Sequence, residues 1–162
     1  MSKPATAVEV FDRSLLRQRR DRAAAHIHQF DFLFLEVAER LMERMDIIQK
    51  KFPLVVDLGS LHGVMTERLR KRVGTEHVIS ADMSLAMARQ SGGSAVVADE
   101  EFLPFQTASL DAVVSNLNLH WVNDLPGALL QIKQALKPDG LFLGAMLGGE
   151  SLTELRQCLM EA

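Results

Sequence analysis

A glycine loop follows the apolar run LVV and carries residue types that could hold a nucleoside-like ligand. It reads DLGSLHG, from Asp57 to Gly63, and its glycines, Gly59 and Gly63, let the backbone turn tightly and approach a ligand. A loop for a pyrophosphate dinucleotide prefers G-x-G-x-x-G, whereas the glycines here are spaced G-x-x-x-G and follow an acid. The carboxylate of Asp57 would repel a pyrophosphate, but it can organise the loop and an ammonium group.

Acidic residues follow at the ends of the next two apolar runs. Asp82 ends HVISAD, and a carboxylate there can accept hydrogen bonds from both hydroxyls of a ribose. Asp99 and Glu100 end SAVVADE, where a carboxylate can accept a hydrogen bond from the exocyclic amine of adenine. Each feature alone also has a structural explanation, such as helix packing at Gly59 or a position beside the helix cap Ser84 for Asp82.

Together these residues favour S-adenosylmethionine over NAD as the cofactor, because the acids fall at successive strand ends while the loop disfavours pyrophosphate. The fourth apolar run ends in Ser115 and Asn116, at the same predicted edge. The candidate cofactor-binding residues are Asp57, Gly59, Ser60, Gly63, Asp82, Met83, Asp99, Glu100 and Asn116.

The elements that must position these residues alternate between short apolar runs and helical segments. Residues 52–162 contain five such runs, namely LVVDLG, HVISAD, SAVVAD, LDAVVSN and LFLGAML. Strands alternating with crossover helices predict an α/β fold with a doubly wound, mostly parallel, Rossmann-like sheet. Ligands of such folds bind beyond the carboxyl ends of the strands. Residues 1–51 are predicted to form an N-terminal helical extension, with one helix capped by Asp12 and another over about 31–51, within a single globular unit.

Composition limits the classes of function. The chain has 162 residues, 48% of them hydrophobic and 24% charged, and a net charge of -3, so nothing attracts it globally to nucleic acid or to a membrane. The single cysteine, Cys158, suits a reducing compartment. No apolar run could span a bilayer, and the first ten residues lack a signal or transit pattern. The expected location is the bacterial cytoplasm, or the mitochondrial matrix if the source is eukaryotic.

Five longer segments of the chain match one known family. They are FDRSLLRQRRDRAA (11–24), FPLVVDLG (52–59), ADEEFLPF (98–105), NLNLHWVNDLPGAL (116–129) and LKPDGLFLGAMLGGESLTELR (136–156). With these segments the chain resembles the class I S-adenosylmethionine-dependent methyltransferases, and more narrowly the group containing the mitochondrial complex I assembly factor 5 and its bacterial relatives. This resemblance implies a cofactor loop at Asp57, Gly59 and Gly63, a ribose-binding acid at Asp82 and an adenine contact at Asp99. Members are described as methyltransferases or, for the assembly factor, as an arginine hydroxylase acting on a complex I subunit.

Two departures from the family pattern bear on the function. The middle glycine of the family loop is Leu61 here, and a leucine forced to positive φ costs about 1 kcal/mol or more. Its side chain could crowd the methionine part of the cofactor or point into the core. The family sheet also continues beyond LFLGAML, so the last strands are expected to be missing and the fifth strand to form an apolar edge. The chain is then a fragment, or an oligomer covers that edge.

Residues on the substrate side are less well defined by the sequence. His120 and Trp121 follow the fourth strand, and Arg13, in a run of arginines, could close over the cofactor carboxylate. The histidines and Cys158 lack zinc-ligand spacing, so no metal site is predicted. A facial iron site would need two histidines and a carboxylate that converge in space.

The sequence therefore favours an S-adenosylmethionine-dependent methyltransferase acting on a small molecule or a protein side chain. The alternative is an assembly-factor-like protein that contacts a respiratory complex I subunit, with arginine-hydroxylase-type chemistry or no catalysis. No nucleic-acid partner is expected, because no aromatic residues interleave the arginine run and no Asn-Pro-Pro-aromatic motif follows the fourth strand.

Overall fold

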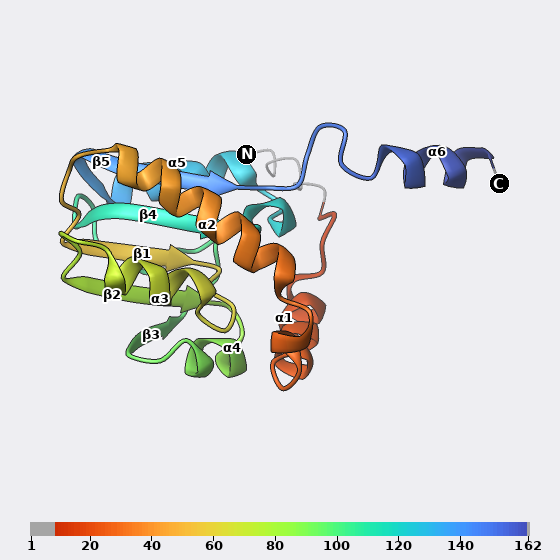
Figure 1. Cartoon of the computed structure of the whole chain (residues 1–162). Helices are drawn as coiled ribbons and strands as arrows, with labels where there is room; N and C mark the ends of the chain where they lie inside the picture. Colours follow the sequence, from red (N-terminus) through yellow and green to blue (C-terminus); the bar gives the residue numbers. More distant parts are fainter. Residues whose placement is uncertain (1–8, 162) are drawn as a thin grey trace, which may run out of the picture.

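A parallel five-stranded sheet forms the centre of the protein, described by a computed structural model over residues 9–161 (Figure 1). The strand order is β3-β2-β1-β4-β5, and every neighbouring pair is parallel. This confirms the predicted doubly wound α/β class. The strands are β1 (Leu54–Leu58), β2 (His77–Asp82), β3 (Ser94–Val97), β4 (Leu110–Asn116) and β5 (Leu136–Ala145).

Helices connect the strands and cover the sheet. No helix within residues 9–161 is long and apolar enough to cross a membrane. The helices are α1 (Arg13–Ala23), the short 3-10 turn η1 (Ile27–Gln29), α2 (Phe32–Ile47), α3 (Val64–Lys71), α4 (Leu85–Gln90), the 3-10 turn η2 (Leu119–Trp121), α5 (Leu125–Ala135) and α6 (Thr153–Glu161).

Two apolar clusters fix the helices against the sheet. Ala38, Leu41 and Met45 of α2 pack with residues of α3 and with one face of β1. Ile132 and Ala135 of α5 pack with the side chains on the opposite face. Because side chains alternate along a strand, β1 contributes to both clusters. Helix α2 is therefore part of the core.

The sheet order changes direction beside β1, and this positions the candidate site. The connection from β3 crosses over β2 and β1 to place β4 on the other side of β1. Ligand sites of doubly wound sheets lie at such a switch point, beyond the carboxyl ends of the strands. The loops after β1 and β4 meet there, and α1 lies across the same end of the sheet (Figure 1).

The predicted cap Asp12 is confirmed, and the helix predicted over about 31–51 ends earlier, at Ile47. The side chains of Asp12, Ser84 and Asp124 accept hydrogen bonds from amides of the first turns of α1, α4 and α5. α6 begins at Thr153, and the Ser151 hydroxyl donates to the carbonyl of Gly148. β5 lies at the sheet edge, as expected, and α6 leads away from the sheet (Figure 1).

Candidate functional site

The glycine loop after β1 is packed tightly against its neighbours. Gly59 has φ +76°, and the amides of Gly59 and Ser60 donate to the carbonyl of Ala81 on β2, at 2.7 and 3.1 Å. A Cβ at Gly59 would lie 2.1 Å from the Asn118 side chain. Gly63 has φ +95°, and a Cβ there would lie 2.7 Å from the Cα of Ser91. Both glycines are thus needed for packing.

Leu61 occupies the left-handed region, with φ +48°. This conformation costs a non-glycine residue about 1–2 kcal/mol. Its amide donates to Asp82 Oδ2 at 3.0 Å, which helps to hold the turn in place. The leucine side chain lines a cavity of about 230 Å³ together with Arg20 and Trp121. The side chain belongs to neither of the two apolar clusters of the core.

Two polar side chains at the base of the loop are buried and incompletely hydrogen bonded. Asp57 is fully buried, and its Oδ2 accepts from the hydroxyl of Thr66 at 2.6 Å, whereas Oδ1 has no partner among residues 9–161. Burial raises the pKa of Asp57 to about 7. The hydroxyl of Ser60 is also buried without a partner in the described chain. Unpaired buried polar atoms are uncommon and are typical of ligand sites.

Asp82 ends β2 and is fully buried. Its Oδ1 accepts from the amide of Ser84 at 2.8 Å and its Oδ2 from the amide of Leu61 at 3.0 Å. The guanidinium of Arg20 adds longer contacts of 3.3 and 3.4 Å. Burial raises the pKa of this carboxyl, and the charge of Arg20 opposes the rise. Asp82 thus joins the glycine loop, α4 and α1.

Two arginines of α1 point into the strand ends and pair with acids there. Arg20 is buried and donates to Asn118 Oδ1 and, at 3.5 Å, to Glu100 Oε1. Arg13 donates to Asp99 Oδ1 at 2.6 Å and to Glu100 Oε2. Glu100 is fully buried, and its Oε1 also accepts from Asn118 Nδ2 at 2.7 Å. We call Arg13, Arg20, Asp82, Asp99, Glu100 and Asn118 the acid–arginine cluster.

A cavity of about 280 Å³ lies beside this cluster, at the carboxyl ends of β2 and β3. Met83, Ala98 and Asp99 line it, with Arg13 and Arg17 on the side of α1. A larger cavity of about 740 Å³ lies between α5 and β5 and contains none of the predicted site residues. The smaller cavity contains Met83 and Asp99, two of the predicted cofactor-binding residues. Asp99 and Arg13 also line a third cavity, of about 820 Å³, on the side of Phe11 and Asn123.

The remaining predicted residues surround the loop that follows β4. Asn116 Nδ2 donates to the carbonyl of Phe34 at 2.9 Å, and its Oδ1 is buried without a partner in residues 9–161. His120 is half-buried, and burial lowers the pKa of its imidazole, with the charge of Arg20 acting in the same direction. The indole of Trp121 meets the ring of Phe11 edge-on, with ring centroids 5.5 Å apart.

Sequence reasoning missed the two residues that complete the cluster. Arg20 was one of five arginines in a basic run, and its burial depends on how α1 docks. Asn118 contacts both Arg20 and Glu100 but carries no spacing signal in the sequence. Arg13, which is predicted to close over the cofactor carboxylate, pairs with Asp99 and Glu100. A helical periodicity that places Arg13 and Arg20 seven residues apart on one face of α1 could have indicated the pair.

Comparisons with known proteins find similarity to methyltransferases. A family model described as a methyltransferase domain matches residues 56–144. The chain is 44% identical to "Arginine-hydroxylase NDUFAF5, mitochondrial" of Danio rerio, over 96% of this chain and 50% of that protein. It is 34% identical to the malonyl-[acyl-carrier protein] O-methyltransferase of Methylovorus sp. (strain MP688), over 91% of this chain and 54% of that protein. The chain thus spans about half the length of the curated relatives it matches.

A solved structure shares the fold. A Haloferax volcanii complex pairs the Trm112 methyltransferase activator with a protein described as a methyltransferase, and this neighbour superimposes with a TM-score of 0.71. The two chains are 28% identical, over 78% of this chain and 57% of the neighbour.

Proposed function

The chain belongs to the methyltransferase-domain family, and on this basis we propose that it binds S-adenosylmethionine at the carboxyl ends of β1 to β4 and takes part in methyl transfer. The observation that carries the proposal is the 280 Å³ cavity lined by Met83, Ala98 and Asp99, directly beside the buried Asp82. A carboxylate at each of two neighbouring strand ends provides acceptors for a ribose diol and an adenine amine.

The residues of the glycine loop fit the rest of this cofactor. Asp57 Oδ1 and the Ser60 hydroxyl are buried without partners within residues 9–161, so both can bond to polar groups of a ligand. Ribose hydroxyls at Asp82 would replace the contacts of Arg20, which are the longest that this carboxylate makes. Asp82 would keep its two backbone amides, so binding would not require the loop to refold.

His120 supplies the proposed acceptor for a proton on the substrate side. S-adenosylmethionine, when bound, carries a methyl group on a positively charged sulfur, which a nucleophile can attack. Because burial lowers the pKa of His120, the imidazole is neutral near pH 7 and can accept a proton from the substrate. Its Nδ1 is buried without a partner in the described chain, and Trp121 lies beside it, with ring centroids 5.2 Å apart.

A second candidate function is that of an assembly-factor-like protein that contacts a respiratory complex I subunit. It is favoured by the 44% identity to a protein whose name describes an arginine hydroxylase, and that name also places that protein in the mitochondrion. The side chain of Leu61 supports this alternative, since it takes up space beside the 230 Å³ cavity that a glycine would leave free. The corresponding proposals are a protein side chain as substrate, a complex I subunit as partner, and a location in the cytoplasm or the mitochondrion.

Calorimetric titration with S-adenosylmethionine and S-adenosylhomocysteine tests the cofactor proposal. We expect micromolar binding by the wild-type chain and at least tenfold weaker binding by Asp99→Ala, whose side chain is partly exposed and tolerates removal. Glu101→Ala, two positions after Asp99, is the matched control and should bind like the wild type. Asp82→Ala provides the stronger test, provided that circular dichroism shows it folded. Absence of binding by a folded wild-type chain would leave the assembly-factor function as the better proposal.

A further inference from the structure

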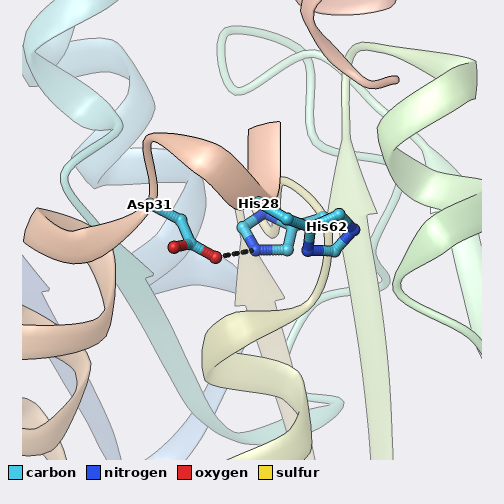
Figure 2. Close-up of side chains that lie close together, drawn as sticks. All are labelled: His28, Asp31 and His62. Carbon is cyan, nitrogen blue, oxygen red and sulfur yellow. Dashed lines mark hydrogen bonds and ion pairs between the residues drawn. The ribbon is translucent and has the colours of Figure 1, made fainter. Parts of the chain in front are cut away.

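Three side chains that commonly bind metals converge beside the glycine loop, outside the acid–arginine cluster. Figure 2 shows His28 and Asp31, from the connection between α1 and α2, together with His62 of the loop. One potential ligand atom from each lies within 4.8 Å of the others. The fold thus brings two histidines and a carboxylate together from segments more than 30 positions apart.

The closest pair already has the spacing of two ligands on one ion. His62 Nε2 lies 2.8 Å from Asp31 Oδ2 (Figure 2). Two ligand atoms at right angles around a metal, each bonded at about 2.0–2.1 Å, lie about 3 Å apart. The third ligand comes from His28, whose ring centroid is 4.5 Å from that of His62. His28 is exposed, so its side chain can adjust toward an ion without disturbing the core.

Asp31 and His62 have no competing role in the contacts of residues 9–161. Asp31 stands at the N-cap position of α2, yet its carboxylate accepts no hydrogen bond from the helix and turns to His62 instead. His62 is 9% exposed, and its Nδ1 has no partner in the described part of the chain. The imidazole is therefore anchored only through Nε2, on the side facing Asp31.

A hydrogen-bonded pair that ties the loop to the start of α2 is the simpler explanation for Asp31 and His62. That explanation gives no role to His28, which contributes to the cluster without a hydrogen bond among residues 9–161. Removal of His28 therefore separates the two interpretations. A structural pair would be unaffected by its loss, whereas a metal site would lose a ligand.

We propose that His28, Asp31 and His62 form a binding site for a divalent transition-metal cation. Two imidazoles and one carboxylate suit zinc, iron, cobalt or nickel rather than calcium or magnesium. Three protein ligands leave further positions on the ion for water or another ligand. Because His62 is next to Leu61, a bound ion would connect the cofactor loop to the segment that carries α1 across the site.

The site departs from the sequence-based expectation of no metal. That expectation came from spacing along the chain, in which His28 and His62 are too far apart to indicate a shared ion. The convergence depends on α2 packing against the sheet beside α3, which places the start of α2 next to the loop after β1.

Titration of the chelator-treated full chain with Co²⁺ and Zn²⁺ tests this proposal. Co²⁺ bound by nitrogen and oxygen ligands gives visible absorption that reports the coordination, and Zn²⁺ should displace it. We expect one equivalent to bind and His28→Ala to weaken binding more than tenfold, since even outer-shell changes cost ten- to a hundredfold. His26→Ala, at an exposed histidine outside the cluster, is the matched control and should bind like the wild type.

Asp31→Asn gives a second measurement, because it keeps a polar side chain of the same size and removes the charged ligand. We expect Co²⁺ binding to weaken while the wild-type circular dichroism is retained. Equal affinity in wild type, His28→Ala and Asp31→Asn would overturn the proposal, as would the absence of Co²⁺ binding by the folded wild-type chain. The readout is metal affinity, so the result is independent of whether S-adenosylmethionine binds.

Discussion

The acid–arginine cluster and the glycine loop lie at the same edge of the sheet, but their buried polar groups differ in how far they are paired. In the cluster, Asp82, Glu100 and Arg20 are buried and hydrogen bonded to one another or to backbone amides, and Arg13 Nε is the only buried side-chain atom of the cluster that lacks a hydrogen bond among the described residues. In the loop, Asp57 and Ser60 are equally buried, yet each leaves an atom unpaired within residues 9–161. The cluster holds α1 against the domain, whereas the loop retains capacity to bond to a ligand.

Both regions contain a leucine in the left-handed conformation. Leu61 has φ +48° in the glycine loop, and Leu117, which precedes Asn118 of the cluster, has φ +50°. Strained conformations persist where the surrounding structure holds them and are concentrated at functional sites. The amide of Leu61 bonds to Asp82, so the cluster supports the strained turn of the loop.

The largest expected effect comes from removing the arginine at the centre of the cluster. Arg20→Met should lower the free energy of unfolding by about 3 kcal/mol, because Asp82 and Glu100 lose their buried counter-ion. Urea denaturation measures the change. Arg19→Met, at the neighbouring exposed arginine, is the control and should change the stability by about 0.5 kcal/mol or less. Equal losses in the two variants would show that the cluster does not stabilise the docking of α1.

The unpaired acid of the loop should impose a pH dependence on stability. The pKa of Asp57 rises from its usual 3.8 to about 7 in the fold, so the folded chain binds a proton that the unfolded chain releases. This contribution stabilises the fold fully below pH 4 and is lost as the pH rises to 7. Between pH 5 and 7 the wild type should lose about 2 kcal/mol more stability than Asp57→Asn, measured by urea denaturation.

Asp82 also has a raised pKa, and its charge adds to the rise at Asp57, so the difference between the two proteins includes this interaction, while the burial of Asp82 is common to both. If the stability of the wild type and of Asp57→Asn changed with pH in parallel, Asp57 would be solvated or paired in solution. The loop would then hold no unpaired buried acid, and it would not differ from the cluster in this respect.

The smallest effect concerns Leu61. Leu61→Gly should change stability by less than about 1 kcal/mol, since relief of the left-handed strain is offset by the greater freedom of glycine in the unfolded chain. It should raise the affinity for S-adenosylmethionine about tenfold by removing the side chain from the 230 Å³ cavity. Leu61→Ala separates the causes, because it retains the strain and removes most of the bulk. Calorimetry that gives the same affinity for all three chains would exclude crowding by Leu61.

The sequence alone determined the class of the sheet, its five strands and the strand end at which Asp82 lies. β4 spans Leu110–Asn116, which is the whole of the apolar run LDAVVSN, and Asp82 ends β2 as its pattern predicted. These features are local, because apolar runs, capping residues and glycines report backbone conformation over a few positions. The family model and the resemblance agree on the same region of the chain.

Tertiary structure decided which charges meet. The docking of α1 selected Arg20 from a run of five arginines and buried it between Asp82 and Glu100, which lie 62 and 80 positions away. The packing of α2 brought Asp31 to His62 in the same way. Hydrogen bonds and ion pairs act over a few ångströms. Residues that are far apart in the sequence come within that distance only when the chain folds, so the pattern of residue types along the chain does not show which of them will pair.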